Sequence, residues 1–172
     1  MIFDYKRKAK SISYGRLRSL RSIQGIVVHY TSNRGDSAMN NADFFATGND
    51  RYAGAHIFID RAGLSAYSVP IRRVAYSVGN PNGSYRPGAF YSILNNTNTV
   101  SIELCDLIGH PVNFAQKKTL IKIVKWLKKK CPNIKYIVRH YDIVQKICPE
   151  YYVENRQEWL VLQKELEKLI KG

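Results

Sequence analysis

Residues 25–30 spell Gly-Ile-Val-Val-His-Tyr, a run of β-branched residues that ends in a histidine and leads into a polar segment. Such a run predicts a buried strand. A second run at residues 136–140, Tyr-Ile-Val-Arg-His, has the same character and also ends in a histidine. Because loops that follow the strands of an open α/β sheet commonly hold active-site groups, both runs indicate the fold and the place of its chemistry.

The rest of the chain alternates between strand and helix patterns. Strand patterns occur at residues 55–60, 64–69 and 99–105, the first two forming a hairpin candidate around Arg61-Ala62-Gly63. Helical patterns occur at residues 37–47, 114–130 and 154–170, with Ser37 as N-cap of the first. The alternation predicts an α/β fold: a single domain with a central mixed β-sheet flanked by helices.

Two further segments lack a clear periodic pattern. Residues 1–24 are expected to form an irregular, basic N-terminal arm in front of the folded domain at residues 25–172. Residues 79–98 are rich in Asn, Gly, Pro, Ser and Tyr, which predicts a long surface loop. Since a loop of that length inside a compact domain is usually functional, we expect it to contribute to the site.

Composition excludes several classes of protein. With 172 residues, 45% hydrophobic and 23% charged, the chain has the composition of one globular domain rather than of a disordered segment. No apolar run reaches the roughly 18 to 20 residues that a membrane-spanning helix needs. The first ten residues are basic with no apolar stretch behind them, so we expect no signal peptide. Three cysteines without a C-x-x-C pair argue against a disulfide framework.

The charge is strongly unbalanced, with 27 Lys and Arg against 13 Asp and Glu, giving a net charge of +14. The excess is concentrated in residues 1–24 and 117–130. Such a balance favours a polyanionic partner: nucleic acid, an anionic membrane surface or a wall that bears teichoic acid. Charge alone does not choose among these partners, nor does it exclude a solvated basic face that has none.

Two imidazoles and one thiol are candidates for a metal site. His29 ends the first strand run, His140 ends the last, and Cys148 follows His140 after eight residues. Together they make a good tetrahedral zinc set, with a fourth position open for water as in catalytic sites. Taken singly, each has a plainer interpretation: a capping or core histidine, or a cysteine that packs as a small hydrophobe.

Five segments, read together, resemble a known family. They are GIVVHYTS at 25–32, GAHIFID at 54–60, AYSVG at 75–79, NTVSIELC at 98–105 and RHYDIVQKICP at 139–149. Over residues 24–152 their order and spacing are similar to those of the zinc-dependent N-acetylmuramoyl-L-alanine amidases. This superfamily also contains the phage lysozyme-type amidases and the peptidoglycan recognition proteins. The resemblance implies hydrolysis of the amide bond between N-acetylmuramic acid and L-alanine of the peptidoglycan stem peptide, by a phage endolysin or an autolysin.

The resemblance also implies roles for individual residues. It places the zinc ligands on His29, His140 and Cys148, an acid near the metal on Glu103, and a lysine that stabilises transition-state charge on Lys146. Glu103 is suited to take a proton from water and pass it to the leaving amine, whereas without the resemblance it would be an exposed strand-end carboxylate. Lys146, or a loop tyrosine, is suited to stabilise the oxyanion.

Two positions depart from the family pattern. Ala55 stands where some phage members carry a catalytic tyrosine, and Ser77 replaces the histidine of a W-H-x-G-like motif. These departures shift transition-state stabilisation onto Glu103 and Lys146. His56 is interpreted as a buried, hydrogen-bonded structural residue or as a group that supports a metal ligand. Asp142 is expected to accept from a ligating imidazole or to cap its loop, and the sequence leaves both open.

Substrate contacts are expected from loops at the same end of the sheet. The candidates are Asn33, Tyr52, Tyr76, Tyr85 and Arg86. The tyrosines offer flat faces for sugar or peptide packing and hydroxyls for hydrogen bonds. The guanidinium of Arg86 is suited to a stem-peptide carboxylate.

Two other functions compete with the zinc amidase. One is a non-catalytic peptidoglycan-binding module, which would have no need of a thiolate at Cys148. The other is a nucleic-acid-binding protein, which rests on the charge alone and lacks a groove-reading motif, so no nucleic-acid partner is expected. The expected partners are peptidoglycan and, through the basic surface, anionic wall polymers. The expected route is synthesis in a bacterial host cytoplasm and release to the wall through a holin-like pore.

Overall fold

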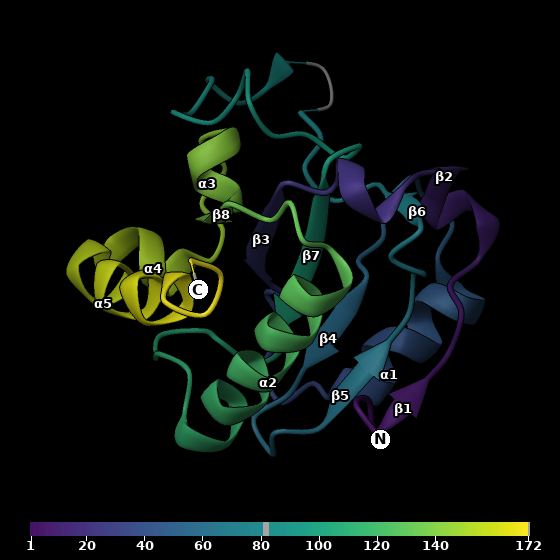
Figure 1. Ribbon diagram of the computed structural model, residues 1–172. Coiled ribbons are helices and arrows are strands. Elements are labelled where there is room, and N and C mark those ends of the chain that lie inside the picture. Colours follow the sequence, from purple (N-terminus) through teal and green to yellow (C-terminus); the bar gives the residue numbers. More distant parts are fainter. Residues whose placement is uncertain (81–82, 172) are drawn as a thin grey trace.

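The computed structural model describes residues 1–80 and 83–171, and within them the largest sheet has six strands in the order β1-β5-β4-β7-β3-β8 (Figure 1). The strands are β1 (Tyr5–Lys6), β3 (Gly25–Tyr30), β4 (Ile57–Ile59), β5 (Ser65–Tyr67), β7 (Thr99–Leu104) and β8 (Tyr136–Arg139). The pair β4–β5 is antiparallel and the other pairs are parallel. The predicted α/β fold with a mixed central sheet is therefore confirmed, as is the 55–69 hairpin.

Helices cover both faces of this sheet. Side chains alternate along β4, so Ile57 and Ile59 join the core under α2 (Phe114–Lys130) and α5 (Arg156–Glu167). Phe58 points to the other face, where it packs with Ala38 and Ala42 of α1 (Ala38–Asp43). In Figure 1, α2 crosses in front of the sheet and α1 lies on the far side. Within the described residues, no helix is long and apolar enough to cross a membrane.

The expectation that residues 1–24 form an irregular segment is wrong. Residues 5–6 form β1, which pairs with β5 at the edge of the large sheet, and residues 14–17 form β2, which pairs with β6 (Arg73–Ala75) in a second, two-stranded sheet. Phe3 is buried and stacks on Tyr67. The segment is ordered because its few apolar side chains and backbone groups find partners more than 50 residues away in sequence.

The helices begin and end at residues that differ slightly from those predicted from the sequence. The helix at 37–47 begins as predicted after the Ser37 cap, then continues from α1 into a π-helical turn over Phe44–Gly48. Met39 of α1 is exposed. The closing helix predicted at 154–170 is α5, which is shorter at both ends, and a separate short helix, α4 (Glu150–Glu154), precedes it. His140 does not end β8 but begins the short α3 (His140–Ile143).

The loop at 79–98 is present, with residues 81–82 outside the described part of the chain. It folds onto α3: the N–H groups of Gly88 and Phe90 donate to the carbonyls of Ile143 and Asp142. The loop therefore supports the segment that carries His140.

Candidate metal centre and active site

The ends of three neighbouring strands bring the predicted ligands together. β3 lies between β7 and β8, and His29 near its end is in register with Glu103 of β7. On the other side Val28 is in register with Arg139, so His140 follows directly beside His29. Cys148 comes from the segment between α3 and α4. The order of the strands therefore brings His29 and His140 together, and the segment between α3 and α4 brings Cys148 to them.

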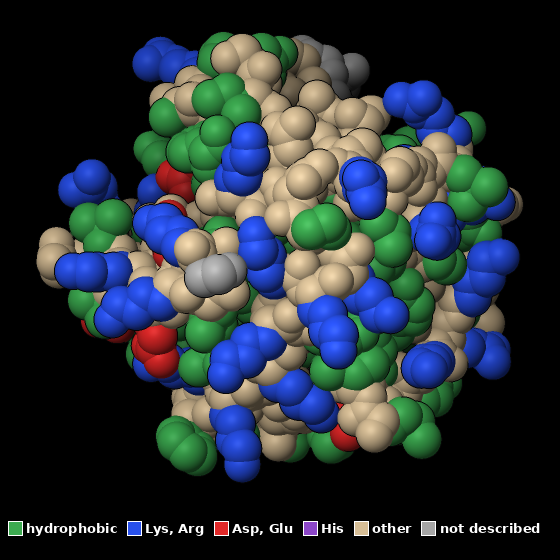
Figure 2. Space-filling view, viewed as in Figure 1, with side chains coloured by type: hydrophobic (Ala, Val, Ile, Leu, Met, Phe, Trp, Pro, Cys, Tyr) green, Lys and Arg blue, Asp and Glu red, His purple; other side chains and the backbone are tan. Residues whose placement is uncertain are grey.

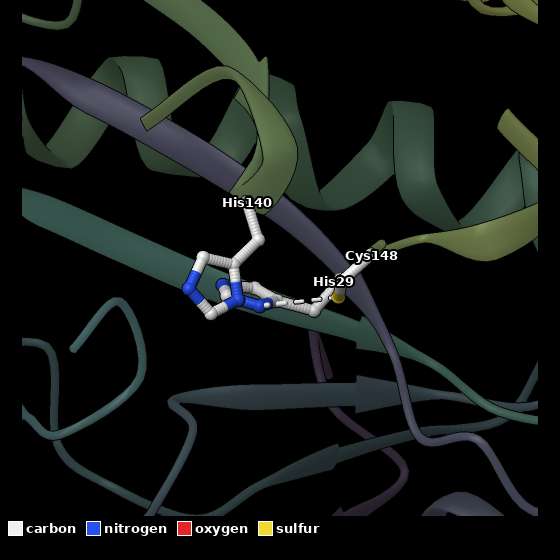
Figure 3. Close-up of side chains that lie close together, drawn as sticks. All are labelled: His29, His140 and Cys148. Carbon is white, nitrogen blue, oxygen red and sulfur yellow. Dashed lines mark hydrogen bonds between the residues drawn. The ribbon is translucent and has the colours of Figure 1, made fainter. Parts of the chain in front are cut away.

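His29, His140 and Cys148 converge closely (Figure 3). One ligand atom from each side chain lies within 4.8 Å of the others. The Cys148 Sγ is 3.7 Å from His29 Nδ1, and the two imidazole centroids are 4.8 Å apart. The three residues are 2%, 3% and 3% exposed, respectively for His29, His140 and Cys148. This is the spacing that one small cation needs to bind all three donors.

Burial keeps these donors neutral when no cation is bound. It lowers the pKa of His29 well below its usual range, helped by His140 and Lys146, and it lowers the pKa of His140 to about 3. Burial likewise raises the pKa of the Cys148 thiol, helped by Glu103. Neutral imidazoles are ready to bind a cation, whereas the thiol must first lose its proton.

Several buried polar atoms at this place have no protein partner. Among the described residues, His29 Nε2, both ring nitrogens of His140 and Glu103 Oε2 make no hydrogen bond. The backbone of Gly79 is close enough to the His140 ring to offset part of its pKa shift, but without normal hydrogen-bond geometry. Because buried polar groups are nearly always satisfied, the unpartnered nitrogens indicate a site built for a ligand. Two imidazoles and a thiolate fit zinc.

The three residues lie at the bottom of a pocket of about 880 Å³ on the α1 face of the sheet. Glu103 and Lys146 also line it. Burial raises the pKa of Glu103 to about 8, a shift that the charge of Lys146 opposes. A carboxyl group with a raised pKa, next to donors that fit a cation, is suited to exchange protons near neutral pH.

Arg139 and Asp142 hold His140 in place. Both Asp142 carboxylate oxygens accept from the Arg139 side chain, and Oδ2 also accepts from the Arg139 backbone N–H at 2.8 Å. The Arg139 Nη1 donates to the carbonyl of Tyr152 at 2.7 Å. Asp142 therefore caps α3, and the alternative that it accepts from a ligating imidazole is wrong. The cap explains why the chain turns into a helix at the ligand itself.

His56 is a structural residue, and the alternative that it supports a metal ligand directly is wrong. Its Nδ1 accepts from the Ser101 backbone N–H at 3.0 Å, and its Nε2 lies 3.1 Å from the Arg73 carbonyl and 2.9 Å from the Arg18 guanidinium. Both ring nitrogens are thereby occupied. Burial, helped by the positive charge of Arg18, lowers its pKa to about 3.

Acid is expected to destabilise the fold through His56. Below pH 6.5 the unfolded chain binds a proton at this residue while the folded chain stays neutral down to about pH 3. Its contribution is therefore complete above pH 6.5 and is lost as the pH falls, by about 1.4 kcal/mol per pH unit. Urea unfolding at pH 7 and pH 5 should show a fall in stability that is about 2 kcal/mol smaller in His56→Gln than in wild type. An equal fall in both proteins would contradict this.

The structure brings some of the predicted substrate residues to the pocket and not others. Asn33, Tyr52 and Tyr76 line it. Tyr85 instead packs with the small core around Val138 and Ile143.

Arg86, like Tyr85, is not among the residues that line the pocket. Its carbonyl accepts from the Gln145 N–H, and the next residue, Pro87, forms a bridge with Val144. The loop folds toward α3 instead of over the pocket, so the expected contacts of these two residues with substrate are not supported.

One wall of the pocket was not predicted from the sequence. Asn40 and Asn41 of α1 and Phe44 of the following π-helical turn line it, and Phe44 is exposed. A weak signal was available: Phe44 and Phe45 are adjacent, and neighbours on a helix point about 100° apart, so one of them had to leave the core. Two positions depart from the family pattern, as the sequence indicated. Ser77 hydrogen-bonds to Ser101, and Ala55 is buried.

Comparison with known proteins agrees with this geometry. The family model described as N-acetylmuramoyl-L-alanine amidase matches residues 19–151. The chain belongs to the N-acetylmuramoyl-L-alanine amidase family. It is 30% identical over 156 residues to the N-acetylmuramoyl-L-alanine amidase CwlL of Bacillus licheniformis, a match that covers 88% of this chain and 42% of that protein. The chain spans less than half the length of the curated relatives it matches.

Solved structures share the fold. The PlyG catalytic domain superposes with a TM-score of 0.74 at 19% identity, covering 96% of this chain and 94% of that one. A mutant endolysin from Bacillus subtilis superposes with a TM-score of 0.70 at 17% identity, covering 94% and 97%. The family resemblance and the fold expected from the sequence are confirmed.

Proposed function

We propose that this protein hydrolyses the amide bond between N-acetylmuramic acid and L-alanine of the peptidoglycan stem peptide. The observation that carries the proposal is the convergence of His29, His140 and Cys148, with unpartnered ring nitrogens, beside Glu103 in an open pocket. Membership of the amidase family supports the reaction class. A non-catalytic binding module would gain nothing from burying three metal donors with unpartnered ring nitrogens among them, which costs stability.

Zinc is the proposed cation, held by His29, His140 and Cys148. The donor set supports this assignment, because a thiolate and two imidazoles favour zinc over magnesium or calcium. When bound, zinc supplies Lewis-acid polarisation of the scissile carbonyl and a water of lowered pKa.

Glu103 and Lys146 are the proposed catalytic residues. A Glu103 carboxylate oxygen takes the proton of the attacking water and passes it to the leaving nitrogen of L-alanine. The Lys146 ammonium faces the negative charge that develops on the carbonyl oxygen. We propose that Asn33, Tyr52 and Tyr76, which line the pocket with the exposed ring of Phe44, bind sugar and stem peptide. All these residues lie within 25–172, the segment to which we assign catalysis.

We also propose a lysin role for the chain. Structural similarity to an endolysin supports it. In this role the protein is made in the cytoplasm of a bacterial host and reaches the wall through a holin-like pore.

The proposal is tested with purified peptidoglycan. Incubation with zinc-loaded protein is expected to release new L-alanine amino termini, measured by amino-group labelling, without new reducing sugar ends. A chelator should stop the release, and added zinc should restore it. Reducing ends without amino termini would mean that a glycosidic bond is cut, and binding to the wall without either product would identify a non-catalytic module.

A further inference from the structure

We propose that the outer face of α2 is a docking surface for the anionic, phosphate-bearing polymers of the bacterial wall. This inference rests on the proposed function in one respect, that the wall is where the protein acts. The surface is separate from the pocket, because α2 packs on the face of the sheet opposite α1.

Four exposed lysines form a line along this helix, and we call them the lysine stripe. They are Lys118, Lys122, Lys125 and Lys129. Their spacings of four, three and four residues place them on one face of the helix. With a rise of 1.5 Å per residue the stripe is about 16 Å long. Figure 2, which looks onto α2, shows Lys and Arg side chains distributed over this face with few acidic ones among them.

The charges of the stripe are largely free. Helix α2 contains no Asp or Glu, and none of the four lysines takes part in an ion pair between described residues. Asp4 is close enough to interact with Lys122, and the ion pair of α2 with α5 uses Lys117, beside the stripe. Four cations with little local compensation produce a positive field that attracts a polyanion.

The positive surface continues beyond the end of α2. Lys130 and Lys135 are exposed there, and so are Arg21 and Arg72 from the N-terminal segment and the β5–β6 connection. Asn133, just after the helix, donates to the Arg21 carbonyl, which ties this part of the N-terminal segment to the helix end. A linear polymer with regularly spaced charges can therefore follow the stripe and continue past it.

The chemistry of the stripe favours a phosphate polymer of the wall over single-stranded nucleic acid or a membrane. Lysine ammonium groups bind phosphates as point charges. Single-stranded nucleic acid needs aromatic platforms for its bases, but Trp126 of α2 packs edge-on against Phe3 and Tyr67. An interfacial membrane helix needs a free apolar face, yet that face of α2 is buried against the sheet. A wall polymer of phosphodiester-linked polyols needs only the charges.

The placement gives the docking surface a function distinct from catalysis. A polymer bound on α2 leaves the pocket open on the other face, so the protein can stay attached to the wall while its pocket engages stem peptides. Attachment of this kind raises the local concentration of substrate without any added contact in the pocket.

Two variants with the same charge change test the proposal. The stripe variant replaces the four stripe lysines by glutamine. The control variant carries Arg7→Gln, Lys8→Gln, Lys10→Gln and Arg16→Gln. In the control, Arg7 pairs with Asp43 of α1 and Lys10 donates to the Asn49 carbonyl, so these two lie toward the α1 face. Melting temperatures of both variants establish that they fold.

Binding is measured by sedimentation with purified walls at 0.15 M salt, before and after chemical removal of the phosphodiester polymers. We expect the stripe variant to bind intact walls at least about tenfold more weakly than wild type, and the control to lose less than about threefold. Wild type should bind stripped walls as weakly as the stripe variant does. Raising the salt to about 0.5 M should abolish the difference, because the screening length falls to a few Å.

Each other outcome overturns the proposal. Equal losses in both variants would mean that total charge, not the α2 face, governs binding. Unchanged binding to stripped walls would identify peptidoglycan itself as the attachment site. Stripe-dependent binding to DNA or to anionic vesicles that is tighter than binding to walls would assign the surface to those partners. Hydrolysis of soluble muropeptides should be the same in the stripe variant and wild type, so an inactive enzyme would contradict the proposed function without affecting the binding result.

Discussion

Cys148→Ala is expected to lose bound zinc and to reduce amidase activity by at least about a thousandfold, because the metal contributes several kcal/mol of transition-state stabilisation. Metal content per protein, measured by mass spectrometry, should fall from about one zinc to near zero. A second readout does not depend on activity. Since a ligand that binds only the folded state stabilises it, a chelator should lower the melting temperature of wild type and leave that of Cys148→Ala unchanged.

Cys105→Ala is the matched control, because Cys105 is also a buried cysteine but packs with the α1 core and is not among the residues that line the pocket. It is expected to keep its zinc and its chelator-sensitive melting temperature. If Cys148→Ala keeps one zinc per chain, the assignment of the third ligand is wrong.

Glu103→Gln is expected to lower the rate by about a hundred- to ten-thousandfold, the range for loss of a general acid–base. The substitution keeps size and shape, and zinc content should stay near one per chain. Stability should not fall, because wild type buries a carboxylate oxygen with no hydrogen-bond partner among the described residues and burial already disfavours its charged form. Lost activity with an equal or higher melting temperature is what we expect of a residue kept for chemistry.

Glu154→Gln, on the exposed end of α4, removes the same charge from the surface and should change neither the rate nor the zinc content. The catalytic assignment of Glu103 would be contradicted if Glu103→Gln retained more than about a tenth of the wild-type rate. A large fall in its melting temperature would instead indicate a structural role.

The parts of the fold that followed from the sequence are those with strong local patterns. Two examples are the β-branched run that ends at His29 and the helix at 114–130, whose apolar residues recur at helical spacing between lysines. In each segment the local pattern alone predicted which side chains are buried. Strands β1 and β2 could not be recognised, because Tyr5–Lys6 and Tyr14–Leu17 are short and mostly polar. Their pairing depends on β5 and β6, which lie more than 50 residues further along the chain.

The candidate site shows the same division. Parallel strands end at the same edge of a sheet, which is why ligands at two strand ends could be expected to meet. The path of the 79–98 loop could not be predicted, because it depends on tertiary contacts. Hydrogen bonds with α3 hold the loop so that Tyr85 and Arg86 lie away from the pocket. The position of Phe44 in the pocket wall could likewise not be predicted. Helical spacing indicates that one of the two adjacent phenylalanine rings is exposed, but it does not indicate which surface the exposed ring lines.

The distribution of the three ligands along the chain has a consequence for synthesis. His29 leaves the ribosome more than 100 residues before His140 and Cys148. The sheet edge that joins them requires β8, so a chain that ends before Cys148 has no complete set of donors. Under the proposed function, a translation product abandoned before Cys148 therefore lacks amidase activity, and the cell that makes the protein is exposed to that activity only after Cys148 has been added to the chain.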